Sequence, residues 1–129
     1  MGELPLRAVL CDDDATVRQV VRGLAEDCGF EVVGEAAMAL EALVLAEMTH
    51  AHVLVLDLSL KGVSGTDVIP AVRTAAPETE ILVYTAFDTL ACLAEEQGVT
   101  DVVRKDEPGK LEAALRRVAA SHGHFVMHP

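Results

Sequence analysis

Short, nearly uninterrupted apolar runs alternate along this chain with longer segments of helical periodicity, and this alternation limits the choice of fold. The apolar runs predict strands at residues 7–11, 30–34, 51–56, 80–85 and 102–104. The segments between and after them predict helices at 15–28, 38–48, 66–75, 89–97 and 108–121. Strands that alternate with helices assemble into parallel sheets. We therefore predict an α/β fold, a doubly wound five-stranded parallel sheet with five helices.

Individual residues mark where several of these helices begin and end. Asp14 precedes the first helix and is a typical N-cap, and Gly29 follows it as a stop signal. Pro108 falls at the first position of the last helix, where its missing N–H costs little. Pro70 lies inside the third helix and is expected to loosen its first turns.

Composition narrows the class of protein further. The 129 residues are 51% hydrophobic but only 3% aromatic, which excludes a disordered chain and predicts a core of small aliphatic side chains. Ten Lys and Arg against 21 Asp and Glu give a net charge of −11, so this segment is not expected to bind nucleic acid directly. Three cysteines without a CxxC pair indicate a reducing compartment. With no signal peptide and no membrane span, we expect one soluble cytoplasmic domain.

Polar residues follow the predicted strands at the ends where function is expected in such a fold. Asp12, Asp13 and Asp14 follow the first strand, Asp57 follows the third, and the fourth and fifth lead to Thr85 and Lys105. Converging carboxylates repel one another unless a cation neutralises them, and hard oxygen ligands suit Mg²⁺. One carboxylate can then act as the nucleophile toward a phosphoryl group, with the hydroxyl and the ammonium holding phosphoryl oxygens.

These residues carry a family resemblance over nearly the whole chain, from about residue 6 to residue 121. The segments VLCDDDATVRQVV, VLVLDLSLKGVSG, ILVYTAF and VVRKDEPGKLEAAL resemble the receiver domains of two-component response regulators, which have the flavodoxin-like fold of CheY. The resemblance implies that Asp57 is the phosphate acceptor. It also implies that Thr85 is the switch hydroxyl and that Lys105 pairs with the phosphoryl group.

The resemblance further implies a Mg²⁺ site and its ligands. Asp13 corresponds to the direct carboxylate ligand, and Asp12 to a carboxylate that helps through a water. Asp57 itself also contacts the ion in the family. Ser59, two residues after the acceptor, corresponds to the residue whose backbone carbonyl binds the metal.

The partner implied by the family is a sensor histidine kinase, which offers a phosphohistidine. The receiver itself catalyses transfer to Asp57 and the later hydrolysis, so we do not expect an enzyme with a separate substrate. Phosphorylation shifts the population between two states of the face made by the fourth helix and fifth strand, and this face also allows a homodimer. The pair Lys105-Asp106 resembles receivers of the NarL/LuxR type.

We assign residues 1–121 to the receiver domain and residues 122–129 to a tail or the start of a linker. The tail HGHFVMHP resembles the start of the linker to a DNA-binding domain. We therefore expect a role in transcription through an output domain outside this chain, with a natural single-domain regulator as the alternative.

Two other functions remain open at this level. Val102 stands where the family usually has Tyr or Phe, and Tyr84 is expected to point to the opposite side of its strand from Thr85. This departure keeps open a phosphorylation-independent interaction module. A phosphatase of the haloacid-dehalogenase type also uses an aspartyl nucleophile, but Asp57-Leu58-Ser59 lacks the second Asp of its D-x-D motif.

Overall fold

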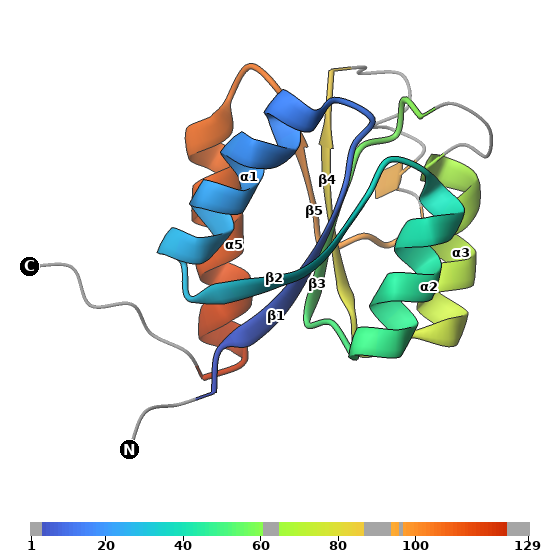
Figure 1. Cartoon of the computed structure of the whole chain (residues 1–129), viewed down its shortest axis with the longest axis horizontal. Coiled ribbons are helices and arrows are strands. Elements are labelled where there is room, and N and C mark those ends of the chain that lie inside the picture. Colours follow the sequence, from blue (N-terminus) through green and yellow to red (C-terminus); the bar gives the residue numbers. More distant parts are fainter. Residues whose placement is uncertain (1–3, 61–64, 87–93, 96, 124–129) are drawn as a thin grey trace, which may run out of the picture.

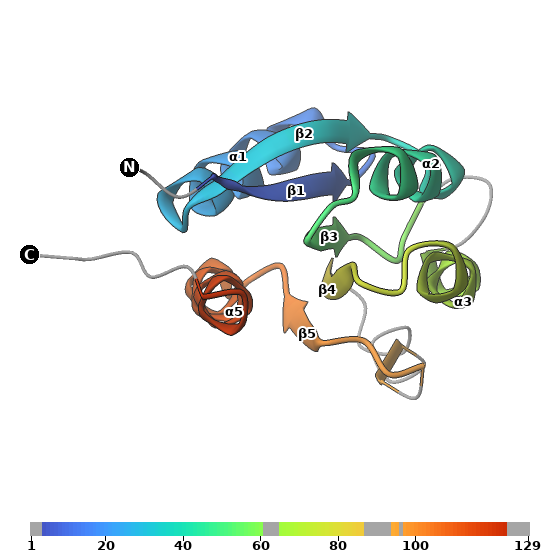
Figure 2. The ribbon, with the colours of Figure 1, turned by 90° about the horizontal axis from the view of Figure 1, so that it is seen from below.

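The computed structural model describes residues 4–60, 65–86, 94–95 and 97–123. Five parallel strands form one sheet in the order β2-β1-β3-β4-β5, which is seen in Figure 2. The strands are β1 (Leu6–Cys11), β2 (Phe30–Ala36), β3 (Val53–Leu56), β4 (Glu80–Thr85) and β5 (Asp101–Arg104). The predicted doubly wound, five-stranded parallel sheet is therefore confirmed.

Helices cover both faces of this sheet (Figure 1). One face carries α1 (Ala15–Asp27) and α5 (Pro108–Ser121), and the other carries α2 (Ala39–Thr49) and α3 (Gly65–Ala75). Within the described residues, none of the helices has the length and apolar character that crossing a membrane requires.

The helix predicted for residues 89–97 lies mostly outside the described residues. The structure describes only residues 94, 95 and 97 of that range, and of these residues 94 and 95 are helical. The described part of the chain thus contains four of the five predicted helices as complete elements.

Each face of the sheet buries its own apolar cluster. Strand residues alternate between the two clusters: Leu82 and Tyr84 pack toward α1 and α5, whereas Ile81 and Val83 pack toward α2 and α3. The central strand β3 is buried at all four of its positions, as a parallel strand covered on both faces requires.

The predicted helix boundaries have the expected chemistry. The Asp14 carboxylate accepts hydrogen bonds from the backbone N–H groups of Thr16 and Val17 at 2.8 and 3.4 Å. Gly29 follows the C-cap of α1 with φ of 93°, a left-handed conformation that Gly adopts without steric cost. Pro70 lies inside α3, which nevertheless runs as one helix over Gly65–Ala75.

The strand order determines where a functional site can form. From β1 the chain passes through α1 to β2 on one side, and β3 pairs with the other side of β1 after α2 has crossed the opposite face. The connections therefore diverge between β1 and β3, and in open α/β sheets ligands bind outside the carboxyl ends of the strands at such a point.

Candidate functional site

Sheet hydrogen bonding continues one residue beyond the ends of three strands and fixes the site residues there. The Asp12 N–H donates to the Ala36 carbonyl at 3.0 Å, and the Asp57 N–H donates to the Cys11 carbonyl at 2.9 Å. The Lys105 N–H donates to the Thr85 carbonyl at 3.0 Å. Each of these side chains therefore starts from a backbone position that the sheet itself holds.

The Lys105 ammonium joins the carboxylates of β1 and β3. Its Nζ lies 2.6 Å from Asp12 Oδ2 and 3.1 Å from Asp57 Oδ2. Asp12 is 5% exposed and Asp57 is 3% exposed, so both carboxylates are largely removed from water. Buried charges of this kind persist when they are paired and hydrogen-bonded. The structure thus brings Asp12, Asp57 and Lys105 together, as their positions at the strand ends predict.

Two further hydrogen bonds hold the carboxylates in place. The Ser59 N–H donates to Asp57 Oδ1 at 3.1 Å, and the Asp14 N–H donates to Asp12 Oδ1 at 2.9 Å. With Lys105 on its other oxygen, each carboxylate is contacted at both of its oxygens. This double contact restricts rotation of the carboxylate groups.

Burial and the neighbouring charges oppose each other at both the acid and the base of the site, and the pKa values of both groups are raised. Burial raises the pKa of Asp12 above its ordinary value, although the Lys105 hydrogen bond opposes this. Burial alone would lower the pKa of Lys105, but the hydrogen bonds that its ammonium donates to Asp12 and Asp57 outweigh this effect and raise that pKa. Burial, together with the charges of Asp12 and Asp57, raises the pKa of the neighbouring Cys11 thiol to about 12.

Three carboxylates form an acidic cluster at this edge of the sheet. Asp12, Asp13 and Asp57 each offer one oxygen, and these oxygens lie within 4.8 Å of one another. Asp13 is exposed, so one side of the cluster is open to solvent. Hard carboxylate ligands with room for water suit Mg²⁺, which retains part of its hydration in proteins. The donor set therefore fits the ion that the sequence predicts.

The remaining predicted site residues lie next to this cluster. Ser59 is partly buried and directs its N–H toward Asp57, as described above. Thr85, at the carboxyl end of β4, is 1% exposed and is joined to Lys105 through the backbone. Its place in the strand alternation, one residue after Tyr84, directs its side chain away from the α1–α5 face.

The sequence did not predict the Arg18 brace, the two hydrogen bonds by which Arg18 joins the backbone of the Asp12–Asp14 segment to Glu35. Arg18 of α1 donates from Nη1 to the Asp12 carbonyl at 2.5 Å and from Nε to Glu35 Oε1 at 3.1 Å. Arg22 also pairs with Glu35. The only sequence signal is a cation one helical turn after the Asp14 cap, which by itself does not distinguish a brace from a solvent-exposed arginine.

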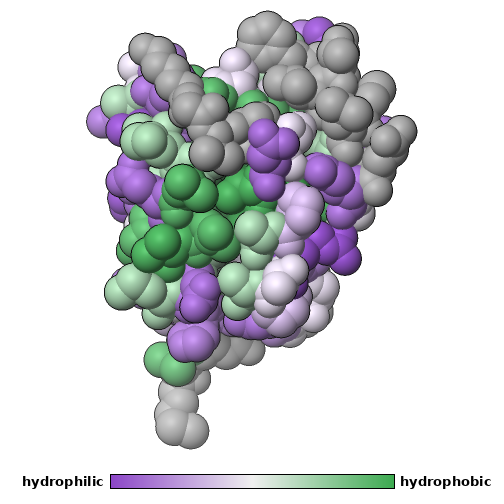
Figure 3. Space-filling model, turned by 90° about the vertical axis from the view of Figure 1, so that its right-hand side faces the viewer, coloured by the Kyte–Doolittle hydropathy of each residue, from purple (hydrophilic) through white to green (hydrophobic). Residues whose placement is uncertain are grey.

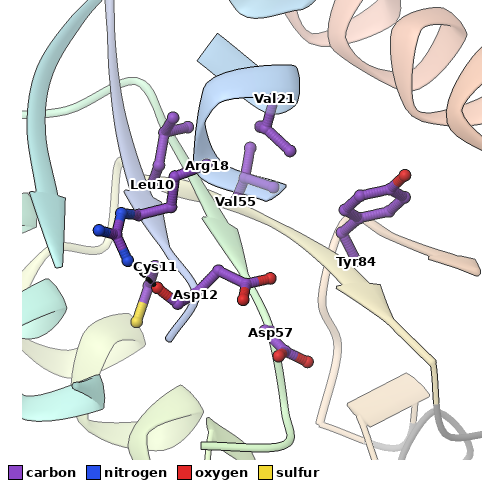
Figure 4. A pocket seen from close by; sticks show the side chains of 8 residues that line it. All are labelled: Leu10, Cys11, Asp12, Arg18, Val21, Val55, Asp57 and Tyr84. Atoms are coloured by element: carbon purple, nitrogen blue, oxygen red, sulfur yellow. Dashed lines mark hydrogen bonds between the residues drawn. The ribbon is translucent and has the colours of Figure 1, made fainter. Parts of the chain in front are cut away.

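Asp12 and Asp57 also line a pocket in which Arg18 lies close to apolar side chains of the core (Figure 4). Figure 4 shows the Arg18 guanidinium beside Cys11 and the Asp12 backbone, with Tyr84 across the pocket. The Tyr84 hydroxyl donates to the Lys105 carbonyl at 3.1 Å, a second contact that the sequence did not indicate. The pocket is lined by Leu10, Cys11, Asp12, Arg18, Val21, Val55, Asp57 and Tyr84.

The fold and the site define an α/β protein with an acidic cluster and a lysine at the switch point of its sheet. Comparison with known sequences agrees: the model of the response regulator receiver domain matches residues 8–116. A nitrate/nitrite response regulator protein homolog of Haemophilus influenzae is 31% identical over 118 residues, which are 88% of this chain and 57% of that protein. The chain thus spans little more than half the length of this relative.

Solved structures give the same answer. A two-component response regulator of the LuxR family from Aurantimonas sp. SI85-9A1 superimposes with a TM-score of 0.82 and 33% identity, over 98% of this chain and 91% of that one. The signal receiver domain of the putative response regulator NarL from Mycobacterium tuberculosis gives a TM-score of 0.77 and 28% identity, over 93% and 97% of the two chains. The chain belongs to the response regulator receiver domain family, and the resemblance to receivers of the NarL/LuxR type is confirmed.

Proposed function

We propose that this receiver domain accepts a phosphoryl group on Asp57 with the help of Mg²⁺ and thereby switches its interaction with a partner or effector. The observation that carries the proposal is the position of the Lys105 ammonium, which contacts both Asp57 and Asp12 beside a cluster of three carboxylates. This arrangement provides a nucleophile, a cation and a set of metal ligands within a few ångströms of one another.

Asp57 is the nucleophile in this proposal. A carboxylate oxygen of Asp57 forms a bond to the phosphorus of a phosphohistidine on a sensor histidine kinase. The bond between phosphorus and the histidine nitrogen breaks, and that nitrogen keeps the electron pair. The Ser59 N–H and the Lys105 ammonium restrict the rotation of the carboxylate before it reacts, which reduces the entropy lost on reaching the transition state.

Lys105 and Thr85 then hold the transferred group. The Lys105 ammonium already forms an ion pair with Asp57, so it can neutralise charge on a phosphoryl oxygen after transfer. Thr85 is buried at the end of β4 and supplies the hydroxyl that the phosphoryl group attracts.

The metal ligands in this proposal are Asp12, Asp13, Asp57 and the backbone carbonyl of Ser59. Mg²⁺, when bound, neutralises charge on the phosphoryl oxygens. Asp12 holds its place through Lys105, the Asp14 N–H and the Arg18 contact to its backbone. Asp13 is exposed and provides the ligand that faces solvent.

Residue 102 is Val, so switching in this chain cannot depend on an aromatic ring at that position. The Val102 side chain is partly buried and packs in the cluster toward α2 and α3. Tyr84 lies in the opposite cluster, and its hydroxyl is bound to the Lys105 carbonyl. We infer that movement of Thr85 is transmitted through the packing of Val102 and through the β5 backbone rather than through rotation of a ring.

We also propose a biological setting for this receiver. Residues 1–121 form the receiver, and residues 122–129 lead toward an output domain through which the whole protein controls transcription in the cytoplasm. Because this segment has a net charge of −11 and would be repelled by a phosphate backbone, we assign nucleic-acid binding to that output domain. In this proposal the receiver catalyses only its own phosphorylation and dephosphorylation, and its phosphorylated form can form a homodimer.

Intact mass spectrometry after incubation with acetyl phosphate tests this function. We expect the mass to rise by one phosphoryl group when Mg²⁺ is present, and we expect no gain with EDTA or for Asp57→Asn. An unmodified mass for the folded protein in the presence of Mg²⁺ would favour the phosphorylation-independent interaction module instead.

A further inference from the structure

Helix α2 is apolar around most of its circumference. Its inner side is formed by Ala39, Ala42 and Ala46, which are buried against the sheet. The only polar residues among its eleven are Glu41, Glu47 and Thr49. A helix that is apolar on all sides is normally covered on all sides, but the sheet and α3 cover only part of α2.

The uncovered side of α2 carries a continuous stripe of large apolar side chains. Leu40 is 51% exposed, Val44 is 53% exposed and Met48 is 74% exposed, and their spacing of four residues aligns them along one face. Met38, the N-cap residue two positions before Leu40, is 48% exposed and adds apolar surface at the start of the helix. Figure 3 shows the resulting hydrophobic area on the side of the molecule that carries α2 and α3.

This α2 stripe (Met38, Leu40, Val44 and Met48) is unusual for the part of the chain that the structure describes. It contains four of the six large hydrophobic residues there that are exposed, the others being Leu4 and Val20. Single exposed apolar residues are common, whereas a contiguous patch marks an interaction site. Methionine side chains also adapt easily to different partner surfaces.

Acidic side chains lie along both sides of the stripe, and a cation, the Arg7 guanidinium, lies only at the C-terminal end of α2, where it donates to the Thr49 and His50 carbonyls. Glu41 and Glu47 are exposed and lie on either side of it by helical geometry. Residues 23–60 contain seven acidic residues and no Lys or Arg. The Arg73 guanidinium of α3 is already bonded to the carbonyls of Gln97 and Gly98. A second copy of this chain would bring the same acidic border against this one, which like-charge repulsion opposes.

We propose that the α2 stripe docks a basic amphipathic helix of another protein, with apolar side chains on one face and Lys or Arg on both sides of that face. The apolar face would cover Leu40, Val44 and Met48, and its basic residues would meet Glu41 and Glu47. This surface lies on the opposite face of the sheet from α1 and α5. It requires no phosphoryl group on Asp57, so the proposal is independent of the function proposed above.

The probe for this test is a labelled synthetic helix of 18 residues with a leucine stripe between rows of lysine. Fluorescence anisotropy measures its affinity for the full chain, and amide chemical shifts locate the contact. We expect shifts along α2 and about tenfold weaker binding to the variant Leu40→Gln/Val44→Gln. The control Val20→Gln changes an equally exposed residue on α1 and should leave the affinity within about twofold.

Charge is tested separately with Glu41→Gln/Glu47→Gln. This variant should bind the lysine-flanked peptide several-fold more weakly and lose most of its salt dependence. All these side chains are exposed, so urea unfolding should confirm intact variants, and Met48→Gln provides a further variant of the stripe.

Three results would overturn the proposal. The first is the absence of saturable peptide binding. The second is binding that survives both the stripe substitutions and a change from lysine to glutamate in the peptide. The third is a dimer in sedimentation that Leu40→Gln/Val44→Gln abolishes, because the occupant would then be a second copy of this chain.

Discussion

Replacing Lys105 with Met tests how the two buried carboxylates are stabilised. The substitution keeps most of the apolar stem but removes the ammonium that lies 2.6 Å from Asp12 and 3.1 Å from Asp57. The side chains of these acids are 7% and 4% exposed, so water replaces the lost partner poorly. Removing one member of a buried ion pair costs about 3–5 kcal/mol.

The lower end of that range applies here because the Lys105 side chain is 22% exposed and one side of the cluster faces solvent. We expect Lys105→Met to lower the free energy of unfolding by about 3 kcal/mol at neutral pH without metal. For a domain of this size that is roughly 10 °C in Tm. Mg²⁺ should recover part of the loss, since a divalent ion at the acidic cluster supplies positive charge.

Urea unfolding in EDTA and in Mg²⁺ measures both effects. The matched control is Lys110→Met, because Lys110 is largely exposed and, among the residues that the structure describes, its ammonium pairs only with Glu107, the N-cap residue of α5. Its loss should stay within about 0.5 kcal/mol. If Lys105→Met were as stable as the control in EDTA, our account of the ion network would be refuted.

Three further predictions concern the surroundings of the site. The pKa of Asp12 in the folded protein is raised above 3.8, so the folded state binds more protons than the unfolded state between 3.8 and that raised value. The free energy of unfolding of the metal-free protein should therefore fall as the pH rises through this range. Urea unfolding at several pH values measures this fall, which Asp12→Asn should not show. The Cys11 and Cys28 thiols are buried and have raised pKa values, so iodoacetamide at pH 8 should modify them only after urea has unfolded the protein. Rapid modification of either thiol in the folded Cys92→Ser variant would contradict this. Arg18→Lys loses the planar fork that holds the Asp12 carbonyl and should weaken Mg²⁺ binding about tenfold by calorimetry, whereas unchanged affinity would mean that Arg18 is only a surface residue.

Strands were predictable here because a parallel sheet covered on both faces needs nearly continuous apolar runs. β4 occupies exactly the predicted residues 80–85, and β1 begins one residue earlier than predicted. The largest differences are two residues each: β3 begins at Val53 and not at residue 51, and β2 extends past Gly34 to Ala36. Its pairing with β1 continues there after an irregularity between Ala8 and Val9, and such a tertiary effect leaves no mark in the apolar pattern.

The site was predictable to the level of which residues meet, but not of how they contact one another. The carboxyl ends of parallel strands share one edge, so Asp12, Asp57 and Lys105 had to converge. The bond from the Tyr84 hydroxyl to the Lys105 carbonyl, and that from Arg18 to Asp12, depend on rotamers and on packing between α1 and the sheet. Neither residue type nor spacing encodes those details.

The exposed face of α2 shows a second limit of sequence reading. The segment 38–48 is predicted as a helix, and nothing in its composition distinguishes Met38 and Met48 from apolar residues that pack in the core. The structure instead leaves both exposed, at 48% and 74%. Only the position of α2 at the side of the sheet, beside the edge strand β2, reveals which of its apolar side chains lack cover.

The most direct test of the central claim is to locate the phosphoryl group. Borohydride reduces an aspartyl phosphate to homoserine, which peptide mass mapping can assign to a residue. After treatment with acetyl phosphate and Mg²⁺, we predict homoserine at Asp57 alone, and none when EDTA is present. Homoserine at Asp12 or Asp13, or its complete absence despite a folded, metal-supplied protein, would contradict the assignment of Asp57 as the phosphate acceptor.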